Sequence, residues 1–209
     1  NRSNDFGCFT CQSGCIAGDV EELMNDDMLK GKLVRLVAGE PEATAMEFYR
    51  WCANAEFQRL CSTDYVLQFS AKKLKDRFEK DAEKDPPPFY DFFIHTLAED
   101  RLIGGISLEG GAYPSGETFV GIAIGDPADW GKGYGSDAMN IILRYAFHEL
   151  NLRRVALNTF EYNPRGIRSY EKVGFVHEGR MRGYLSREGQ RWDLIFMGIL
   201  REEWEARNQ

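Results

Sequence analysis

A glycine-rich turn between an apolar strand and an apolar helix constrains this chain more than any other stretch. Residues 119–124 form a short apolar segment, and Gly125, Asp126 and Pro127 follow it. This is expected of a buried strand that ends in a turn. After Ser136, apolar residues recur at helical spacing in two stripes. One stripe contains Ala138, Ile141, Ile142, Tyr145 and Ala146, and the other contains Met139, Leu143, Phe147 and Leu150. Two stripes predict a helix that is covered on more than one side.

The turn between them is Asp129-Trp130-Gly131-Lys132-Gly133-Tyr134-Gly135-Ser136. A glycine-rich turn that opens a helix presents backbone N–H groups without intrahelical partners at the positive end of the helix dipole. Such a helix start is a site for anions, and above all for phosphates. The same glycine rhythm also occurs in plain tight turns, so the turn alone does not identify a ligand.

Two familiar phosphate motifs do not fit this turn. A dinucleotide fingerprint that starts at Gly131 would need Gly at the position of Ser136. A nucleoside-triphosphate loop would need Gly in place of Asp126, and Ser or Thr in place of Gly133. The ligand must be decided by residues elsewhere in the chain.

A second motif lies downstream of the predicted helix. Asn163-Pro164 precedes the run Arg168-Ser169-Tyr170-Glu171-Lys172-Val173-Gly174-Phe175. The two motifs, in this order and at this spacing, resemble the signatures of the GCN5-related N-acetyltransferase (GNAT) superfamily. The resemblance runs from about Lys30 to Trp204. It is greatest to the branch of ribosomal-protein alanine and spermidine acetyltransferases, which shares Trp130 where most of the superfamily has Gln or Arg.

The resemblance implies an α/β fold with a mixed, mostly antiparallel central sheet flanked by helices, in a single domain at residues 29–209. It also implies acetyl-CoA as co-substrate. The loop amides would hold the pyrophosphate, and a splayed strand would hold the pantetheine arm. The residues implied are Ile122, Ala123, Ile124, Trp130, Gly131, Lys132, Gly133, Tyr134, Gly135, Ser136, Asn163 and Tyr170. Asp137 would repel phosphate, so we expect its carboxylate to point away.

Tyr170 is the predicted general acid, because in the family a Tyr at this position faces the cofactor sulfur. A phenol with a pKa of about 10 stays protonated at neutral pH and can donate a proton to a developing thiolate. Asn163 is expected both to cap a helix that has Pro164 in its first turn and to contact the pantetheine. Arg168 and Lys172 are either exposed helix cations or contacts to the nucleotide phosphates.

The general base stays open. Some relatives carry Glu at the position of Asn158, which cannot take a proton. Glu161, Glu109, Glu117, His95 and a chain of water molecules are the alternatives, while His148 and His177 are expected at the surface or in packing. No Cys lies in either motif, which favours direct attack by the amine over an acyl-enzyme.

Charge and composition exclude some partners. The net charge is −7 and the pI about 5.1, which disfavours nucleic acid and favours cationic partners such as amines. No apolar run is long enough to cross a bilayer and no secretory signal is visible. Cys52 and Cys61 are isolated within predicted helices, as in a reducing compartment. We therefore expect a cytoplasmic enzyme with no membrane partner.

Residues 1–28 are expected to form a polar N-terminal extension. Cys8, Cys11 and Cys15 could supply three zinc ligands, but no fourth Cys or His lies nearby, so no metal site is predicted. A short helix at residues 20–29 would pack on the domain or on a second subunit. The sequence does not define the oligomeric state, although a homodimer is possible.

The remaining pattern predicts strands at residues 32–37, 92–97, 102–108, 154–160, 175–184 and 192–200. Helices are expected from Glu40-Pro41, at residues 71–84 after a Ser70 cap, at residues 163–173, and at residues 201–206. The first helix would turn Ala45, Phe48, Tyr49 and Cys52 inward. The resemblance to the GNAT superfamily implies that the segment between the first two strands lines the acceptor pocket. In this chain the segment offers Trp51, Phe57, Tyr65, Phe69, Phe89, Tyr90, Glu47, Glu56 and Asp64.

The leading interpretation is an acetyl-CoA-dependent N-acetyltransferase that acts on a primary amine, either a protein N-terminus or a small amine or polyamine. One alternative is a module that binds acyl-CoA without turnover, which Asn158 keeps open. The other is an interaction protein on the same scaffold that docks through its Cys-bearing N-terminus. An intact loop together with Tyr170 argues against both alternatives, although a fold alone does not define a function.

Overall fold

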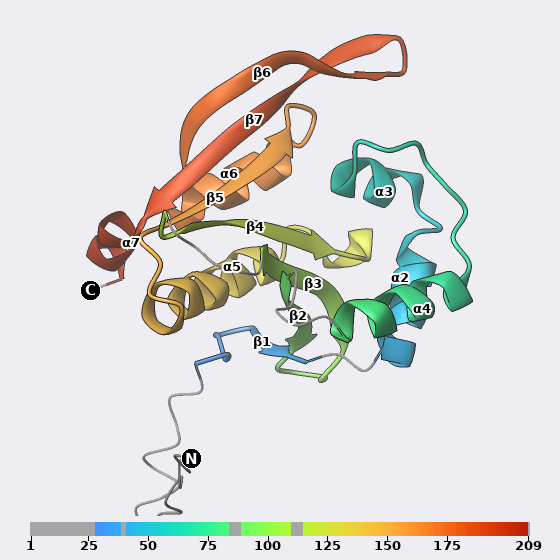
Figure 1. Ribbon diagram of the computed structural model, residues 1–209, viewed down its shortest axis with the longest axis horizontal. Coiled ribbons are helices and arrows are strands. Elements are labelled where there is room, and N and C mark those ends of the chain that lie inside the picture. The colour runs from blue at the N-terminus through green and yellow to red at the C-terminus, as the bar shows by residue number, and fades with distance from the viewer. Residues whose placement is uncertain (1–27, 39–40, 84–88, 110–114, 209) are drawn as a thin grey trace, which may run out of the picture.

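One seven-stranded sheet, in the order β1-β2-β3-β4-β5-β7-β6, organises the molecule (Figure 1). The computed structural model describes residues 28–38, 41–83, 89–109 and 115–208. The strands are β1 (Val34–Val37), β2 (Phe89–Thr96), β3 (Leu102–Glu109), β4 (Glu117–Ile124), β5 (Arg154–Phe160), β6 (Val176–Arg187) and β7 (Gln190–Leu200). Neighbouring strands are antiparallel except β4 and β5, which are parallel. The predicted mixed, mostly antiparallel sheet is confirmed.

Helices cover both faces of this sheet. They are α2 (Pro41–Trp51), α3 (Ala55–Cys61), α4 (Ala71–Ala82), α5 (Tyr134–Arg144), α6 (Pro164–Val173) and α7 (Arg201–Arg207), with a 3-10 turn η1 (Pro127–Asp129) and a π turn η2 (Tyr145–Glu149). In Figure 1, α2, α3 and α4 gather at one end of the molecule, whereas α5 runs beneath the sheet toward α7. The β6–β7 hairpin extends beyond the remaining strands.

The main core lies between α5 and the sheet. Ala138, Met139, Ile141, Ile142 and Leu143 of α5 are all buried, so both apolar stripes of the predicted helix are covered. They pack in one cluster with buried strand residues, among them Ile106, Leu108, Val155, Leu157 and Met197. Burial of apolar surface on this scale fixes α5, and therefore the glycine-rich turn that leads into it.

Helix α6 has the bounds that its sequence predicts. Asn163 caps it, because its Oδ1 accepts the Gly166 N–H at 3.0 Å, and Pro164 fills the first helical position. At its other end Gly174 has a φ of +121°, a conformation that L side chains rarely adopt. These two signals fix the position of Tyr170 between them.

Several expectations differ from the structure or lie outside it. The strand expected at residues 92–97 is β2, which already begins at Phe89. Strand β1 begins at Val34 rather than at residue 32, because the Lys32 and Leu33 amides donate to the Asp137 carboxylate at 3.2 and 2.7 Å. That contact also confirms that Asp137 points away from the loop. Tyr49 is 45% exposed and does not face inward; Thr44 and Trp51 of α2 are buried instead. The helix predicted at residues 20–29 falls almost wholly outside the described residues.

Candidate active site

Strands β4 and β5 separate after a short parallel contact. Only three pairs join them, Glu117 with Arg154, Thr118 with Val155 and Phe119 with Ala156, although β4 continues to Ile124 and β5 to Phe160. Beyond Phe119 the two strands no longer share hydrogen bonds, so the sheet opens there. Each strand keeps its outer partner, β3 for β4 and β7 for β5.

The opening exposes backbone groups of β4. Gly125 donates its N–H to Ile103 of β3 at 2.9 Å. Because amide directions alternate along a strand, the N–H and C=O groups of Ile122 and Ile124 point away from β3, toward the opening. The Ile124 carbonyl there accepts the indole N–H of Trp130 at 2.8 Å. The Ala123 amide faces β3, so Ala123 meets the opening through its side chain.

The glycine-rich turn forms the start of α5 beside this opening. Gly131 and Gly133 have φ values of +77° and +91°, and Gly133 is the N-cap residue of α5. No side chain caps this helix in the described structure. The first intrahelical bond runs from the Asp137 N–H to the Gly133 carbonyl at 3.0 Å, so the amides of Tyr134, Gly135 and Ser136 precede it. This is the geometry of an anion site at a helix N-terminus.

An ion pair between the buried Asp129 carboxylate and Arg101 stabilises the glycine-rich turn. The Asp129 carboxylate is only 3% exposed and receives two hydrogen bonds from the Arg101 guanidinium, at 2.7 and 2.9 Å. The Lys132 ammonium lies 3.3 Å from the same carboxylate. These cations, Arg101 foremost, hold the pKa of Asp129 below its ordinary value of 3.8. These contacts thereby fix the position of Asp129, which directly precedes Trp130.

We expect Asp129→Asn to lower the free energy of unfolding by about 1–3 kcal/mol at pH 7, because Arg101 loses its charged acceptor. Since the folded-state pKa is depressed, the contribution of Asp129 is complete above pH 3.8 and is lost as the pH falls through the lower folded value. The difference between the two proteins should therefore shrink in acid. Urea unfolding at several pH values measures it. Asp126→Asn, which keeps a side-chain oxygen for the Ala128 amide, should change little.

Trp130 and Arg165 link the turn to α6. The Arg165 guanidinium carbon lies 3.7 Å from the centre of the Trp130 ring, within cation–π distance. Burial lowers the pKa of Arg165 from its usual value, but an arginine stays charged. Ser136 and Ser169 add a second link, because their hydroxyls lie 2.8 Å apart. The sequence does not single out Arg165, which lies far from Trp130 along the chain.

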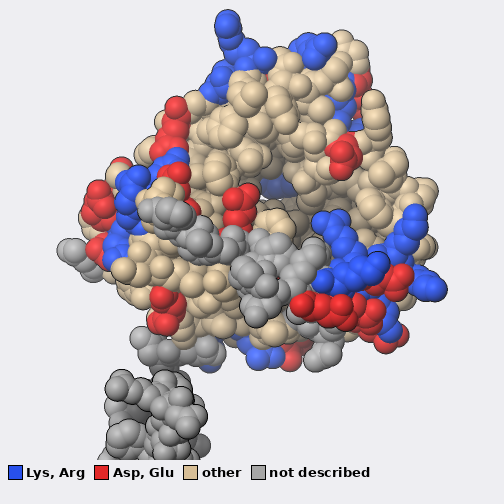
Figure 2. Space-filling model, in the orientation of Figure 1, with Lys and Arg blue, Asp and Glu red and all other residues tan. Residues whose placement is uncertain are grey.

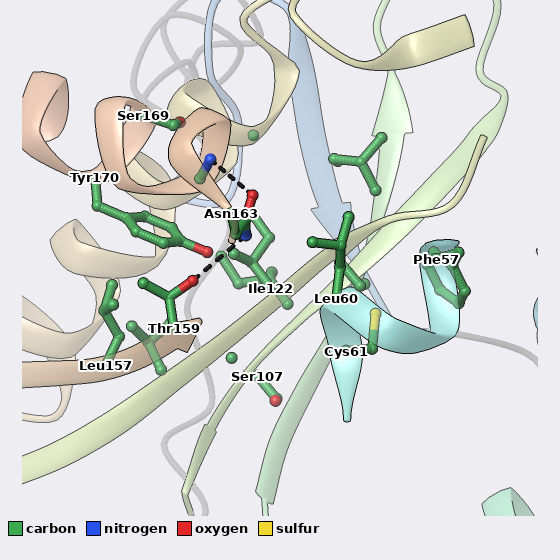
Figure 3. A pocket seen from close by; sticks show the side chains of 18 of the residues that line it. Phe57, Leu60, Cys61, Ser107, Ile122, Leu157, Thr159, Asn163, Ser169 and Tyr170 are labelled. Carbon is green, nitrogen blue, oxygen red and sulfur yellow. Dashed lines mark hydrogen bonds between the residues drawn. The ribbon is translucent and has the colours of Figure 1, made fainter. Parts of the chain in front are cut away.

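Tyr170 points from α6 into the opening between the strands. In Figure 3 its phenol is directed past Asn163 and Thr159, toward the side on which Ile122 lies. The ring packs against Phe175 with centroids 6.2 Å apart, and burial raises the pKa of the phenol to about 12. The Asn163 amide donates to Thr159 Oγ1 at 3.4 Å. Tyr170 is therefore a protonated hydrogen-bond donor across the physiological pH range.

One cavity of about 980 Å³ joins these parts. Figure 2 shows the hollow near the centre of this face of the molecule. It is lined by Ile122, Ala123, Ile124, Trp130, Gly131, Gly133, Tyr134, Gly135, Ser136, Asn163 and Tyr170, and also by Arg168 and Lys172. Of the residues implied by the resemblance, Lys132 alone is not among the lining residues. Its side chain is directed to Asp129 instead.

The other half of the cavity differs from the sequence expectation. Phe57 and Phe89 line it as predicted, but Trp51, Tyr65, Phe69, Tyr90, Glu47, Glu56 and Asp64 are not among its lining residues. Trp51 packs over Gly125, where an added Cβ would lie 2.0 Å from the indole, and Tyr65 is 90% exposed. Phe48, Phe78, Phe93, Asp91 and Ser107 line it instead. No local sequence motif marks these five residues.

The structure places some of the candidate general bases in the cavity and others outside it. Glu109 and Asn158 line the cavity. Glu161 instead accepts from the Asp193 N–H at 3.2 Å, and Glu117 accepts from Arg154 at 3.0 Å. His95 lies 3.2 Å from Asp100 and is not among the lining residues. Asp91, which the sequence does not single out, is a second carboxylate in the cavity.

Cysteine and metal chemistry find little support in the described residues. Cys61 lines the cavity, and its sulfur is seen on α3 in Figure 3. Although the Cys61 residue as a whole is exposed, desolvation of its thiol by surrounding protein atoms, with a further effect of Cys52, raises the thiol pKa. A protonated thiol is a poor nucleophile. The described ranges contain no cluster of three potential metal-ligating side chains. Within those ranges, no helix has both the length and the hydropathy needed to span a membrane.

The fold with its seven-stranded sheet is shared with a solved N-acetyltransferase structure. Residues 34–176 match the family model described as the acetyltransferase (GNAT) domain. The chain therefore belongs to the GNAT family and is an N-acetyltransferase, and acetyl-CoA is the co-substrate of that family. The resemblance noted in the sequence is confirmed.

Two relatives and one solved structure illustrate the match. Probable N-acetyltransferase YjcK of Bacillus subtilis (strain 168) is 31% identical over 183 residues, or 85% of this chain and 99% of YjcK. The spermidine N(1)-acetyltransferase of Vibrio cholerae is 31% identical over 117 residues, 56% of this chain and 67% of that protein. The crystal structure of spermidine N-acetyltransferase from Vibrio cholerae in complex with CoA and spermine has a TM-score of 0.72 at 24% identity. It covers 82% of this chain and 98% of that chain.

Proposed function

We propose that this chain transfers an acetyl group from acetyl-CoA to a primary amine by direct attack within a ternary complex. The observation that carries the proposal is the joining of three parts in one cavity. These are the uncapped start of α5, the opened edge of β4 and the phenol of Tyr170. The first suits a pyrophosphate, the second a pantetheine arm, and the third a leaving thiolate.

The pyrophosphate binds to the amides of Gly135 and Ser136 and to the left-handed turn at Gly131 and Gly133. Arg165, stacked on Trp130, adds positive charge on the α6 side of the cavity. Lys132 acts indirectly through Asp129. When bound, acetyl-CoA supplies the activated acetyl group as a thioester.

The pantetheine arm extends between the separated strands, where the amides of Ile122 and Ile124 face it. An N–H group on this edge of β4 also stabilises the oxyanion of the tetrahedral intermediate. Asn163 uses its Oδ1 to cap α6, so its remaining hydrogen-bonding capacity, beside Thr159, is directed to the arm.

The neutral amine attacks the thioester carbonyl carbon, and a C–N bond forms as the carbonyl electrons move to oxygen. Collapse of this intermediate breaks the C–S bond, and the Tyr170 hydroxyl protonates the leaving sulfur. The amide nitrogen loses its extra proton to solvent or to a cavity carboxylate, and Tyr170 recovers its own. The products are the N-acetyl amine and free CoA, and no covalent enzyme intermediate forms.

The experiment that tests this proposal is a comparison of melting temperatures with acetyl-CoA, CoA, ATP and NAD added separately. A ligand that binds only the folded protein raises its stability, by about 2.7 kcal/mol at one hundred times its Kd. We expect a rise with acetyl-CoA and CoA and none with NAD. No rise with either thiol cofactor would contradict the proposal. A homodimer stays a prediction, which analytical ultracentrifugation can check.

A further inference from the structure

Six apolar side chains form one wall of the cavity, opposite Tyr170. This apolar wall comes from α2, α3, α4 and β2 and consists of Phe48, Phe57, Leu60, Leu74, Phe78 and Phe93. Figure 3 shows Phe57 and Leu60 of α3 across the cavity from Tyr170.

Three rings of the apolar wall brace one another. Phe48 and Phe78 meet edge to face with centroids 5.4 Å apart, Phe78 and Phe93 at 6.2 Å, and Phe48 and Phe93 at 6.5 Å. Edge-to-face pairing is a favourable arrangement of aromatic rings. The wall is therefore already assembled before any acceptor binds.

The floor beneath the wall is short of side chains. Asp91, Ser107 and Gly121 are paired in register across β2, β3 and β4. The next step along, Phe93 with Gly105 and Ala123, places the Phe48 ring 3.6 Å from the position of a Gly105 Cβ. A Cβ at Gly121 would meet only Ser107 Oγ, at 3.5 Å. The Phe48 ring thus rests on the floor at Gly105, and the open space for a bulky group lies beside it, over Gly121.

Negative charge is confined to one region of this half of the cavity. Asp91 lines it, and Glu109 lies nearby on β3, two residue pairs further along the same two strands. Asp129, the third carboxylate of the lining, is bound by Arg101 under the loop. The apolar wall itself contributes no carboxylate, and Arg77 of α4, which lies between Leu74 and Phe78 in the sequence, adds a positive charge to the same lining.

We infer that the acceptor carries a single ammonium group and that its carbon skeleton ends in a bulky apolar group. An arylalkylamine and a peptide N-terminus with a large apolar first side chain share this chemistry. The ammonium group approaches near Asp91 and gives its proton to solvent or to a cavity carboxylate. The neutral amine then attacks, while the apolar group packs on the wall. A polyamine would place a second ammonium against apolar side chains, where desolvation of a charge is costly. The inference rests on the proposed function.

The test compares kcat/KM for acetyl transfer to phenethylamine, putrescine and spermidine, and to two short peptides that differ only in a first Phe or Ser. Release of free thiol from acetyl-CoA gives the rate. We expect phenethylamine or the Phe peptide to exceed both polyamines by at least about tenfold. The comparison of phenethylamine with the Phe peptide tells a small amine from a protein N-terminus. Equal or faster acetylation of spermidine would overturn the inference.

Two variants test the wall itself. Phe78→Asp, which places a carboxylate in the wall, should lower kcat/KM for phenethylamine at least about tenfold and improve putrescine relative to it. Tyr49→Ala alters an exposed side chain on α2 outside the cavity and should change neither value. A melting-temperature rise with CoA shows that each variant is folded. Unchanged specificity in folded Phe78→Asp would contradict the assignment of the wall.

Failure of the proposed function gives a different result. If acetyl-CoA and CoA leave the melting temperature unchanged, the proposed function fails regardless of the acceptor. If CoA binds but no amine is turned over, calorimetric titration of phenethylamine and spermidine into the CoA complex decides the inference. Tighter binding of phenethylamine supports the apolar wall as an acceptor site, and equal or weaker binding overturns it.

Discussion

Tyr170→Phe is expected to lower kcat by about 100- to 1,000-fold while leaving the Kd for CoA within about threefold. The phenol is the donor to the leaving sulfur, and general acids of this kind contribute about 10²–10⁴ in rate. The aromatic ring, which packs on Phe175, is retained in Phe, so the cavity keeps its shape. Steady-state thiol release measures kcat, and calorimetry measures the binding of CoA.

The pH dependence sharpens this prediction. Burial raises the pKa of Tyr170 to about 12, so the phenol stays protonated well above neutral pH. The kcat of the wild-type protein should therefore not fall through ionisation of Tyr170 as the pH rises to about 10. Any earlier loss of rate would have to come from another group.

The matched control is Tyr145→Phe. Tyr145 is also a partly buried Tyr with a raised pKa, but it packs against Phe92 and Tyr90 and does not itself line the cavity. Its loss of a hydroxyl should leave kcat unchanged. If Tyr170→Phe kept full activity, Tyr170 would not be the general acid. If the wild-type protein bound acetyl-CoA but turned over no amine, the result would support the alternative that the protein binds acyl-CoA without turnover.

The cofactor half of the site could be predicted from the sequence because its signals are local. Asn163 with Pro164 fixes the start of α6, and Gly174 fixes its end, so the position of Tyr170 follows from neighbouring residues. The glycines of the turn mark left-handed backbone in the same way. Each of these features depends on the conformation of a few adjacent residues, which the sequence states directly.

The acceptor half could not be predicted because it is assembled over long distances in the chain. Phe48, Phe78 and Phe93 come from three separate elements, and an apolar residue looks the same in a core and in a cavity wall. Tyr49 shows that an error of one residue is enough to place a helical side chain on the wrong face. Adjacent residues on a helix differ by about 100° in direction, so Phe48 lines the cavity while Tyr49 faces solvent. The contact of Arg165 with the Trp130 ring is likewise between residues that lie far apart in the sequence.

Gly135→Glu is expected to raise the Kd for CoA by at least about 100-fold while the protein stays folded. Gly135 lies in the first turn of α5 and lines the cavity, so a carboxylate there would occupy the anion site. Two like charges 4 Å apart repel by about 4 kcal/mol at an effective dielectric constant of about 20. The same carboxylate is favourable for α5 itself, because acidic groups stabilise a helix N-terminus. Loss of binding would thus arise from repulsion of the phosphate rather than from unfolding.

Gly135→Ala separates charge from size. An added Cβ would lie 3.8 Å from Ile124 Cγ1 and 3.9 Å from Ile122 Cδ1, which is ordinary van der Waals contact, so this variant should bind CoA nearly as well as the wild type. Calorimetry gives the Kd of each variant, and high salt should partly restore binding to Gly135→Glu, since salt screens exposed charges. Equal binding by Gly135→Glu and Gly135→Ala would mean that the phosphates lie elsewhere. The uncapped start of α5 would then be a structural turn only, and Arg168 and Lys172 of α6, which also line the cavity, would be the next residues to change.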